Sequence, residues 1–259
     1  MRWIIALSVL SACDRVLGLK ENIDARSIDA PIGYVSAVLA DQPLAYWRLG
    51  SASQSVVVDE TANGNMGTFV GGVQPGDAGP LVGDQDTAMR FDGVDDFVAI
   101  GDRLEFPGVA PFSFELWVKP HNHDVAYTGV LSKTDEQAGG NTKSGFLIFD
   151  HFGKFGAERN AGDTAQNVET TAALPVDVWT YVVVTFDGAT LSLYLDGQSQ
   201  ATNATPISIP STTNGFVLGA RNGGEYLRYP GVIDEVAVYD HALSPERIDA
   251  HRRAALTPP

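Results

Sequence analysis

The strongest constraint on the fold is a repeated alternation of apolar and polar side chains. In "PFSFELWVKP" (111–120), apolar residues occupy every second position: Phe112, Phe114, Leu116 and Val118. Successive side chains of a β-strand point to opposite faces, so a period of two predicts a strand with one face buried. Similar short segments recur along most of the chain. The sequence therefore predicts a protein built almost wholly of strands.

Two Asp-Gly dipeptides mark turns between such strands. In "TYVVVTFDGATLSLYLDGQ" (180–198), Asp187-Gly188 separates two β-rich runs and Asp196-Gly197 follows the second. Asp-Gly tolerates the positive φ of tight hairpins, so both dipeptides predict antiparallel pairing. Short strands that are partly apolar on both faces pack as two sheets. We therefore predict an all-β, two-sheet antiparallel sandwich of jelly-roll type.

Two segments depart from the strand pattern and predict short helices. "YVSAVLADQ" (34–42) precedes the first strand, and "SPERIDAHRRA" (244–254) lies near the end of the chain. In the second, Ser244 suits the N-cap and Pro245 the first helical position. No internal repeat or linker divides the strands, so we expect one domain over residues 34–259.

The charge of the chain limits its partners. Its 259 residues include 32 acidic and 17 basic side chains, a formal charge of −15. Such a surface repels nucleic acids and anionic lipid headgroups, so neither is an expected partner. The balance agrees with an extracytoplasmic domain and with cation binding.

The N-terminal segment predicts export and a lipid anchor. "MRWIIALSVLSAC" combines Arg2, an apolar run and small residues before Cys13, the single cysteine of the chain. This order is typical of a secretory signal, and "LSAC" resembles a bacterial lipobox. We expect a signal peptide over residues 1–12, lipidation at Cys13 and a flexible tether over 13–33, which gives a lipoprotein of a bacterial cell envelope, on the periplasmic face or the cell surface. The alternatives are an incidental buried cysteine after a signal peptide, or a short core helix.

Four ordered segments carry a family resemblance. They are "AYWRLG" (45–50), "VDETANGNMGT" (58–68), "AMRFDGVDDFVAIGD" (88–102) and "GVIDEVAVYDHALSPERI" (231–248). Together they resemble the laminin-G-like, concanavalin A-like jelly-roll domains of bacterial secreted proteins. The resemblance implies a jelly-roll sandwich that serves as a binding or structural module, often with a calcium ion.

The residues do not support an enzyme. Related jelly-roll glucanases carry a Glu-x-Asp array on one strand, whereas no glutamate here has an aspartate two positions later. No Gly-x-Ser-x-Gly elbow is present either. We therefore expect a non-catalytic module.

Two acidic segments are candidates for calcium binding. In "GVIDEVAVYD", alternation places Asp234 on the face of Val232 and Val236, where a carboxylate needs a partner. The resemblance implies that acids of this strand share one calcium ion with the "DETANGN" segment, which gives Asp59, Asn65 and Asp234 as ligands. The alternative is that Asp59 caps its own turn and that Asp234 bonds to backbone.

The acids Asp92, Asp95 and Asp96 stand between two apolar runs, "MRF" and "FVAI". Acidic and glycine residues favour tight turns, so we interpret this segment as a hairpin turn bounded by Phe91 and Phe97.

Polar and aromatic residues in loops and at strand ends are the candidates for ligand binding. Aromatic rings stack on sugar faces while charged groups bond to hydroxyls, and the candidates for such contacts are Tyr127, His151, Arg159, Arg221, Tyr226 and Tyr229. "ARNGGEYLRYP" (220–230) is expected to be an exposed loop. The alternative is an ordinary polar loop whose tyrosines pack on a sheet edge.

Two classes of function remain open from the sequence. The first is a lipoprotein whose domain binds glycan or polysaccharide. The second is an envelope adhesion or scaffold module that binds extracellular protein partners or serves structure alone.

Overall fold

The structure, a computed structural model, describes residues 33–50, 55–137 and 142–258. The predicted signal segment, Cys13 and all of the predicted tether except residue 33 lie outside the described residues. None of the helices in the described part of the chain has the length and apolar character that a membrane crossing requires.

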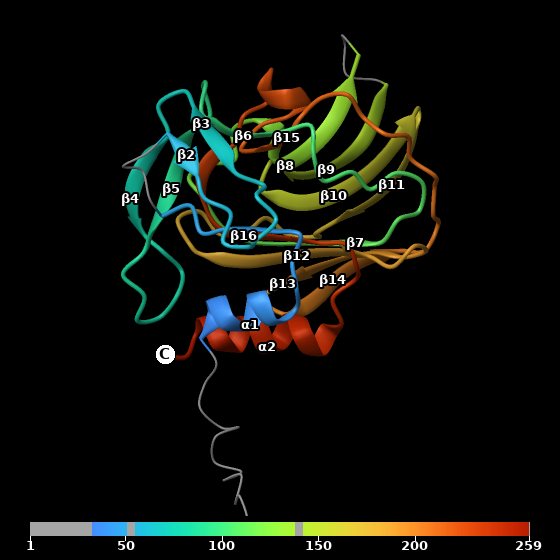
Figure 1. The fold of residues 1–259 in the computed structure, drawn as a ribbon. Helices are drawn as coiled ribbons and strands as arrows, with labels where there is room; N and C mark the ends of the chain where they lie inside the picture. The colour runs from blue at the N-terminus through green and yellow to red at the C-terminus, as the bar shows by residue number, and fades with distance from the viewer. Residues whose placement is uncertain (1–32, 51–54, 138–141, 259) are drawn as a thin grey trace, which may run out of the picture.

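The described strands form two antiparallel sheets that pack face to face, which confirms the predicted all-β sandwich (Figure 1). Sheet A has the order β14-β13-β12-β7-β16-β5-β4, with β1 beside β16, and sheet B has the order β11-β10-β9-β8-β15-β6-β3-β2. The strands of sheet A are β1 (Ala45–Trp47), β4 (Gln74–Ala78), β5 (Thr87–Asp92), β7 (Phe112–Pro120), β12 (Thr180–Phe186), β13 (Leu191–Leu195), β14 (Gln198–Asn203) and β16 (Pro230–Tyr239). Those of sheet B are β2 (Val56–Val57), β3 (Gly67–Val70), β6 (Phe97–Gly101), β8 (Ala126–Glu136), β9 (Lys143–His151), β10 (Lys154–Gly162), β11 (Thr164–Glu169) and β15 (Phe216–Leu218).

An aromatic core holds the two sheets together. Phe114 of β7 and Phe146 of β9 face each other across the sandwich, with ring centroids 4.9 Å apart. Phe106 lies 5.8 Å from each of these two rings. Burial of such large apolar side chains is the main stabilising contribution to a fold of this kind.

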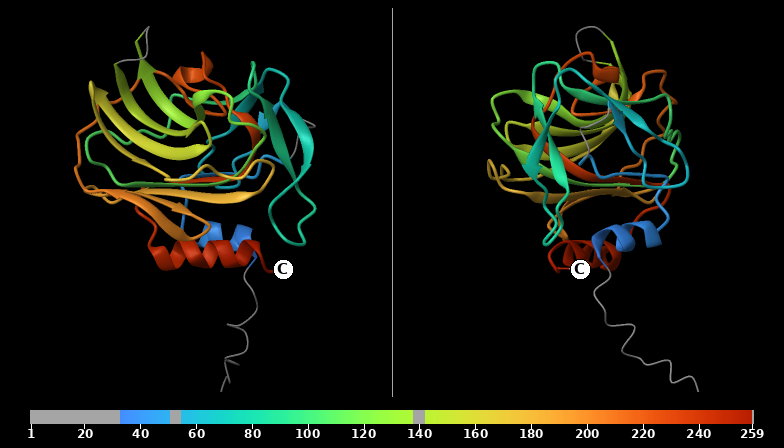
Figure 2. Two further views of the ribbon diagram at one scale, coloured as in Figure 1. Left: turned by 180° about the vertical axis from the view of Figure 1, so that it is seen from behind. Right: turned by 60° about the vertical axis from the view of Figure 1, so that its left-hand side comes forward.

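Two helices cover the outer face of sheet A (Figures 1 and 2). They are α1 (Tyr34–Ala40) and α2 (Pro245–Ala255), and both were predicted from the sequence. The Ser244 side chain accepts a hydrogen bond from the Arg247 backbone N–H, as the N-cap prediction requires.

A buried ion pair fastens α2 to sheet A. His251 of α2 is fully buried, and its Nδ1 lies 3.0 Å from Oε2 of Glu115 on β7. The same carboxylate accepts hydrogen bonds from the hydroxyls of Tyr34 (2.7 Å) and Tyr239 (2.8 Å). On the other side of the imidazole, Nε2 lies 3.0 Å from Asp41 Oδ2. One carboxylate therefore joins both helices to the sheet.

The hairpin prediction is right at two turns and wrong at a third. Strand β12 pairs with β13, and β13 with β14, so Asp187-Gly188 and Asp196-Gly197 each close a hairpin. The segment 92–96 also turns tightly, with Asp96 Oδ2 accepting from the Asp92 backbone N–H at 3.0 Å. However, β5 before it belongs to sheet A and β6 after it to sheet B. The turn therefore crosses between the sheets instead of pairing two neighbours.

A β-bulge corrects the prediction for Asp234. Its side chain is buried, as expected. However, the register of β16 against β7 shifts between Asp234 and Ala237, and Glu235 has a φ of 51°. The extra residue puts Ile233, instead of Asp234, in the core cluster that contains Val236. A strict alternation cannot anticipate the inserted residue.

Candidate functional site

A hollow of about 290 Å³ brings together three of the predicted ligand-binding residues, Tyr127, Arg221 and Tyr226. Its lining residues come from β8, β9 and β10 of sheet B and from the β15–β16 loop. Figure 2 shows that these three strands curve together. The loop between β15 and β16, which contains the 3₁₀ helix η2 (Asn222–Gly224), closes one side. The residues that line the hollow are Ala126, Tyr127, Glu136, Lys143, Glu158, Arg221, Tyr226 and Leu227.

The floor of the hollow is a buried ion pair between Arg221 and Glu136. The guanidinium donates from Nε to Oε1 at 2.9 Å and from Nη2 to Oε2 at 2.6 Å, a two-pronged geometry. The two side chains are 5% and 0% exposed. Glu136 also accepts from the Tyr226 hydroxyl at 3.0 Å and from Thr134 Oγ1 at 3.0 Å. Burial, and then the hydrogen bond to Glu136, raise the pKa of Tyr226 to about 12, so this tyrosine remains a donor.

A glycine in β8 lets the β15–β16 loop reach this position. A Cβ at Gly129 would lie 2.4 Å from the Ala220 carbonyl oxygen and 2.5 Å from Arg221 Cγ. The Gly129 N–H donates to the Leu227 carbonyl at 2.7 Å, so the loop is joined to the strand by backbone. Any larger residue at this position would push Arg221 away from Glu136.

A second ion pair lines the other wall. Lys143 of β9 donates to Glu158 of the neighbouring strand β10, and the side chains are 17% and 8% exposed. An ammonium group has three N–H donors, and a carboxylate accepts several hydrogen bonds. Both groups therefore keep capacity for the hydroxyls of a ligand.

Tyr127 supplies an exposed aromatic face at the edge of the hollow. The residue is 38% exposed, and its ring stacks on His151 with centroids 4.1 Å apart and an interplanar angle of 17°. Its φ of 59° lies in the left-handed region, which a bulky side chain rarely adopts. Arg221 Nη1 donates to the Tyr127 carbonyl at 3.1 Å and helps to hold that conformation. Such strained residues concentrate at functional sites.

Two of the predicted ligand-binding residues, Arg159 and Tyr229, are fully buried and line no part of the hollow, so their prediction as surface contacts is wrong. Arg159 lies between the sheets, where its guanidinium carbon is 3.6 Å from the centroid of the Phe186 ring and Nη2 donates to the Gly108 carbonyl at 2.7 Å. Tyr229 belongs to the main core cluster, and its ring is 6.3 Å from that of Phe155. The prediction of an exposed loop over 220–230 is therefore wrong for most of the segment: Ala220, Arg221, Asn222, Gly224 and Tyr229 are buried, and only Glu225 is exposed.

The hydrogen bonds of Asp59 match a capped turn. Oδ1 accepts from the N–H of Tyr46 (3.1 Å) and of Thr61 (3.0 Å), and Oδ2 accepts from the N–H of Asn65 (2.7 Å). The Asn65 side-chain amide donates to the Leu44 carbonyl at 2.7 Å. N–H donors converge here, whereas calcium needs six to eight oxygen ligands.

Asp234, the third predicted calcium ligand, has different surroundings. A Cβ at Gly79 would lie 2.9 Å from Asp234 Oδ2, and Oδ1 has no hydrogen-bond partner among the described residues. Among the described residues, no hydrogen bond joins Asp59 or Asn65 to Asp234. A bound calcium ion stays a prediction, and chelation tests it.

One cluster of three acids does occur in the described part of the chain. Oxygens of Asp92, Asp95 and Asp96 lie within 4.8 Å of one another. Their oxygens accept backbone hydrogen bonds: Asp92 Oδ1 accepts from the Val94 N–H of the turn at 2.7 Å, and Asp96 Oδ1 accepts from the Gly72 N–H of the β3–β4 connection at 2.5 Å. The cluster is explained by the turn.

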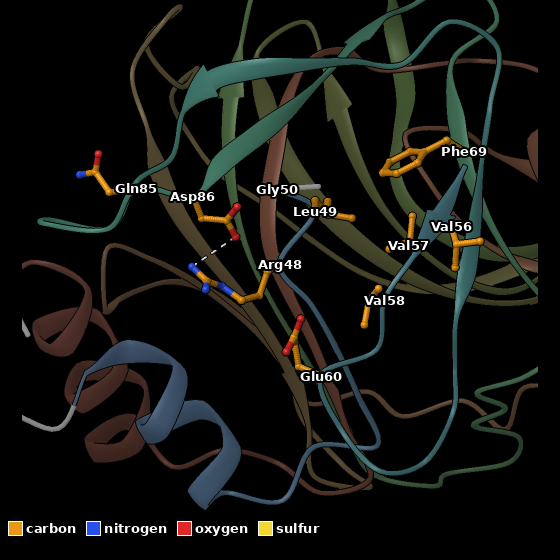
Figure 3. A pocket seen from close by; sticks show the side chains of 10 residues that line it. All are labelled: Arg48, Leu49, Gly50, Val56, Val57, Val58, Glu60, Phe69, Gln85 and Asp86. Atoms are coloured by element: carbon orange, nitrogen blue, oxygen red, sulfur yellow. Dashed lines mark ion pairs between the residues drawn. The ribbon is translucent and has the colours of Figure 1, made fainter. Parts of the chain in front are cut away.

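A larger hollow of about 430 Å³ lies beside β2, β3 and the segment that precedes β5, and Figure 3 shows its lining. Arg48 points toward Asp86, with Nη2 and Oδ2 3.3 Å apart, and it also pairs with Asp84 and Glu235. Gly50 on its rim directly precedes residues 51–54, which lie outside the described residues. None of the predicted ligand-binding residues lines this hollow, and we assign no site to it.

Three charged residues of the candidate site were missed from the sequence. Glu136 and Lys143 flank the connection between β8 and β9, and Glu158 lies in "GKFGAERNAG", next to Arg159, which the sequence predicts as a ligand contact. Alternation places Glu158 and Arg159 on opposite faces but does not say which face is turned outward. The sequence therefore shows that the two side chains point to opposite faces of a strand, but it does not show that Glu158 is the outward one.

Comparisons with known proteins agree with this architecture. A family model described as "Concanavalin A-like lectin/glucanases superfamily" matches residues 92–249, more than half of the chain. A comparison with curated protein sequences finds no match.

Several solved structures share the fold. Domain 4 of AbnA, a GH43 extracellular arabinanase from Geobacillus stearothermophilus, in complex with arabinotriose, matches with a TM-score of 0.64 and 20% identity over 81% of this chain and 98% of that one. The binding domain of Paraclostridial Mosquitocidal Protein 1 matches with a TM-score of 0.64 and 14% identity over 83% of this chain and 52% of that one. The botulinum neurotoxin serotype D ligand binding domain, in complex with N-acetylneuraminic acid, matches with a TM-score of 0.63 and 13% identity over 84% and 52%. The chain thus spans about half the length of the two toxin domains.

Proposed function

Because this chain belongs to the concanavalin A-like lectin/glucanases superfamily, we propose that its jelly-roll domain binds glycan or polysaccharide at the hollow between β8, β9, β10 and the β15–β16 loop. The observation that carries the proposal is the exposed ring of Tyr127 beside a floor of paired charges. A sugar ring has an apolar C–H face and a rim of hydroxyls, and binding sites combine an apolar surface with a few placed polar groups. Tyr127 offers the apolar surface, and Lys143 and Glu158 offer the polar groups.

The structural neighbours support a carbohydrate ligand. They include an arabinanase domain in complex with arabinotriose and a toxin domain in complex with N-acetylneuraminic acid. Identities of 20% and 13% relate the folds alone, so the argument for this chain depends on its own hollow.

We propose a module without catalytic activity. Glycoside hydrolysis uses two carboxyl groups, one as general acid and the other as base or nucleophile. In the hollow, Glu136 already accepts hydrogen bonds from Arg221, Tyr226 and Thr134, and Glu158 is paired with Lys143. Both carboxylates are thus engaged by donors of the protein, which does not match a pair that is free to act as acid and nucleophile. Incubation with a bound glycan should therefore release no new reducing ends.

Glycan binding is tested by titrating the purified chain with a panel of polysaccharides and oligosaccharides, with calcium and with a chelator. We expect saturable binding that weakens about tenfold or more in Tyr127→Ala, because an aromatic stacking surface is lost. Lys143→Ala should weaken it as well, because it removes hydroxyl donors. Loss of binding in chelator would show that the predicted calcium ion contributes.

The matched control is Arg90→Ala. Arg90 is a strand residue that pairs with Asp77 on the neighbouring strand, as Lys143 pairs with Glu158, but it lies in sheet A. Arg90→Ala should bind glycan as tightly as the wild type does. No binding by a folded chain, or equal losses in Tyr127→Ala and Arg90→Ala, would contradict the proposal and favour a protein-binding or structural module.

The predicted cellular location of the protein is a separate proposal. We infer from Cys13 and the "LSAC" segment that the chain is a lipoprotein of a bacterial envelope, attached to the membrane only through this anchor. In a bacterial host, the wild type should enter the membrane fraction and incorporate labelled palmitate, whereas Cys13→Ser should do neither. Incorporation of label by Cys13→Ser would overturn the assignment.

A further inference from the structure

Aromatic side chains continue outside the hollow as a row on the surface. The Tyr127 ring stacks on His151, and the His151 ring lies 5.4 Å from that of Phe152 at an angle of 39°. Phe152 is 58% exposed, the largest exposure among the phenylalanine and tyrosine residues that the structure describes. We call Tyr127, His151 and Phe152 the aromatic row. It begins at a residue of the hollow and leads away from it.

The turn that presents Phe152 is held in place. Asp150 Oδ1 accepts from the Gly153 N–H at 2.6 Å, and its Oδ2 lies 2.9 Å from His123 Nδ1. The second nitrogen of His123 is 3.0 Å from the Leu174 carbonyl. Asp150 is itself buried. The turn is therefore tied to two other loops, which is more support than a solvent-exposed connection needs.

Local backbone geometry places both ends of the row at the surface. Phe152 and Gly153 are the two residues of the hairpin turn between β9 and β10, and their φ values of 51° and 88° are those that such a turn requires. Tyr127, with a φ of 59°, lies where the register of β8 against β9 shifts. The turn and the bulge therefore hold both rings where they are exposed to a ligand.

The charges of the hollow are balanced. The guanidinium of Arg221 is neutralised by Glu136, and the ammonium of Lys143 is neutralised by Glu158. His151 in the row faces Glu169, with Nδ1 and Oε2 3.3 Å apart. Among the described residues that line the hollow, every cation is thus paired with a carboxylate, and the whole chain carries a formal charge of −15. Such a surface repels an acidic ligand.

We propose that the site takes an extended, uncharged polysaccharide, with one sugar unit in the hollow and further units along the aromatic row as far as Phe152. This inference rests on the proposed function and names its ligand class. An acidic sugar would leave its carboxylate unpaired beside Glu136 and Glu158, whereas the hydroxyls of a neutral sugar can bond to Lys143 and Glu158 without disturbing either ion pair.

The dependence of affinity on the length of the oligosaccharide tests whether the aromatic row contacts the ligand. Neutral oligosaccharides of one to six units, from a polysaccharide that the wild type binds, are titrated by calorimetry. Affinity should rise with length and then level off. Phe152→Ala should weaken the longer ligands about three- to tenfold, the range of one aromatic contact, and should leave the shortest ligand unchanged. Val94→Ala, which removes an exposed apolar side chain from another turn, should change neither.

Charge and salt test the ligand class. Binding of the neutral ligand should change by less than about twofold between low and high salt, because screening does not affect an uncharged partner. Sialylated and uronic acid oligosaccharides of equal length should bind at least about tenfold more weakly.

The outcomes separate the two proposals. If Tyr127→Ala abolishes binding but affinity is independent of length and of Phe152, the hollow is the site and the extended row is wrong. If acidic ligands bind more tightly and their affinity falls with salt, the uncharged ligand class is wrong although glycan binding stands. If no glycan binds the folded chain, the proposed function itself fails.

Discussion

Replacing Glu115 by alanine is expected to lower the free energy of unfolding by about 3–5 kcal/mol, the cost of leaving one partner of a buried ion pair alone. The variant would leave His251 without its carboxylate inside the protein and the hydroxyls of Tyr34 and Tyr239 without their acceptor. A loss of this size corresponds to a fall in melting temperature on the order of 10 °C, measured by calorimetry. Glu60→Ala, at an exposed glutamate, should change stability by less than about 0.5 kcal/mol.

The same ion pair sets a pH window for the domain. Burial by itself would raise the pKa of Glu115, but the charge and hydrogen bonds of His251 outweigh it, and the pKa lies below its usual value of 4.5. Burial would lower the pKa of His251, but Glu115 outweighs it, and the pKa lies above 6.5. The carboxylate contribution is present above pH 4.5 and is lost as the pH falls further, while the imidazolium contribution is present below pH 6.5 and is lost as the pH rises.

The pair therefore contributes most between pH 4.5 and 6.5. Glu115→Gln, which cannot form the ion pair, should lose this part of the pH dependence when melting is followed across the range. A stability curve that is the same for wild type and Glu115→Gln would show that the pair is not ionised in the folded protein.

Replacing Arg221 by alanine is expected to damage stability and binding together. Glu136, whose side chain is 0% exposed, would lose its cation, at a cost of about 3–5 kcal/mol. The hydrogen bond that holds the Tyr127 carbonyl would also be lost, so the ring should leave its strained position. We expect glycan affinity to fall by more than about tenfold even in the folded fraction. Arg221→Lys keeps the charge but not the two-pronged geometry. Its stability and its glycan affinity should therefore lie between those of the wild type and those of Arg221→Ala.

A double-mutant cycle separates charge from packing at this pair. If the cost of Arg221→Ala comes from the abandoned carboxylate, then Arg221→Ala with Glu136→Ala should be less destabilised than the sum of the single variants, by about 1 kcal/mol or more. Urea unfolding of the four proteins provides the values. Simple additivity would mean that the two side chains contribute independently and that the floor of the hollow is not held by their attraction.

The strands of this fold could be predicted from the sequence, but their membership in a sheet could not. The period of two in β7 and the Asp-Gly turns around β13 identify strands and hairpins because both signals are local. The acids at 92–96 have the same local signal, yet their turn connects different sheets. Turn chemistry fixes how tightly the chain reverses. The partner of each flanking strand is decided by distant residues.

The candidate site was predicted in part. Tyr127, Arg221 and Tyr226 meet in the hollow and His151 lies beside them, because residues at strand ends and loops of one edge gather in space. The predictions for Arg159 and Tyr229 are wrong because polar atoms suggested exposure, whereas Nη1 and Nη2 of Arg159 bond inside the protein to Gln166 and to backbone carbonyls. Glu136 could not be recognised as a residue of the site, because its role depends on Arg221, which is 85 residues away in the chain.

The most direct test of the account is to locate a bound oligosaccharide on the protein by the chemical shifts of its aromatic side chains. We expect the largest changes at the rings of Tyr127 and Tyr226, smaller changes at Phe152 with longer ligands, and none at Trp179, which directly precedes β12 of sheet A. Shifts that saturate with the ligand but cluster around Trp179, and leave Tyr127 unchanged, would contradict the assignment of the hollow as the binding site.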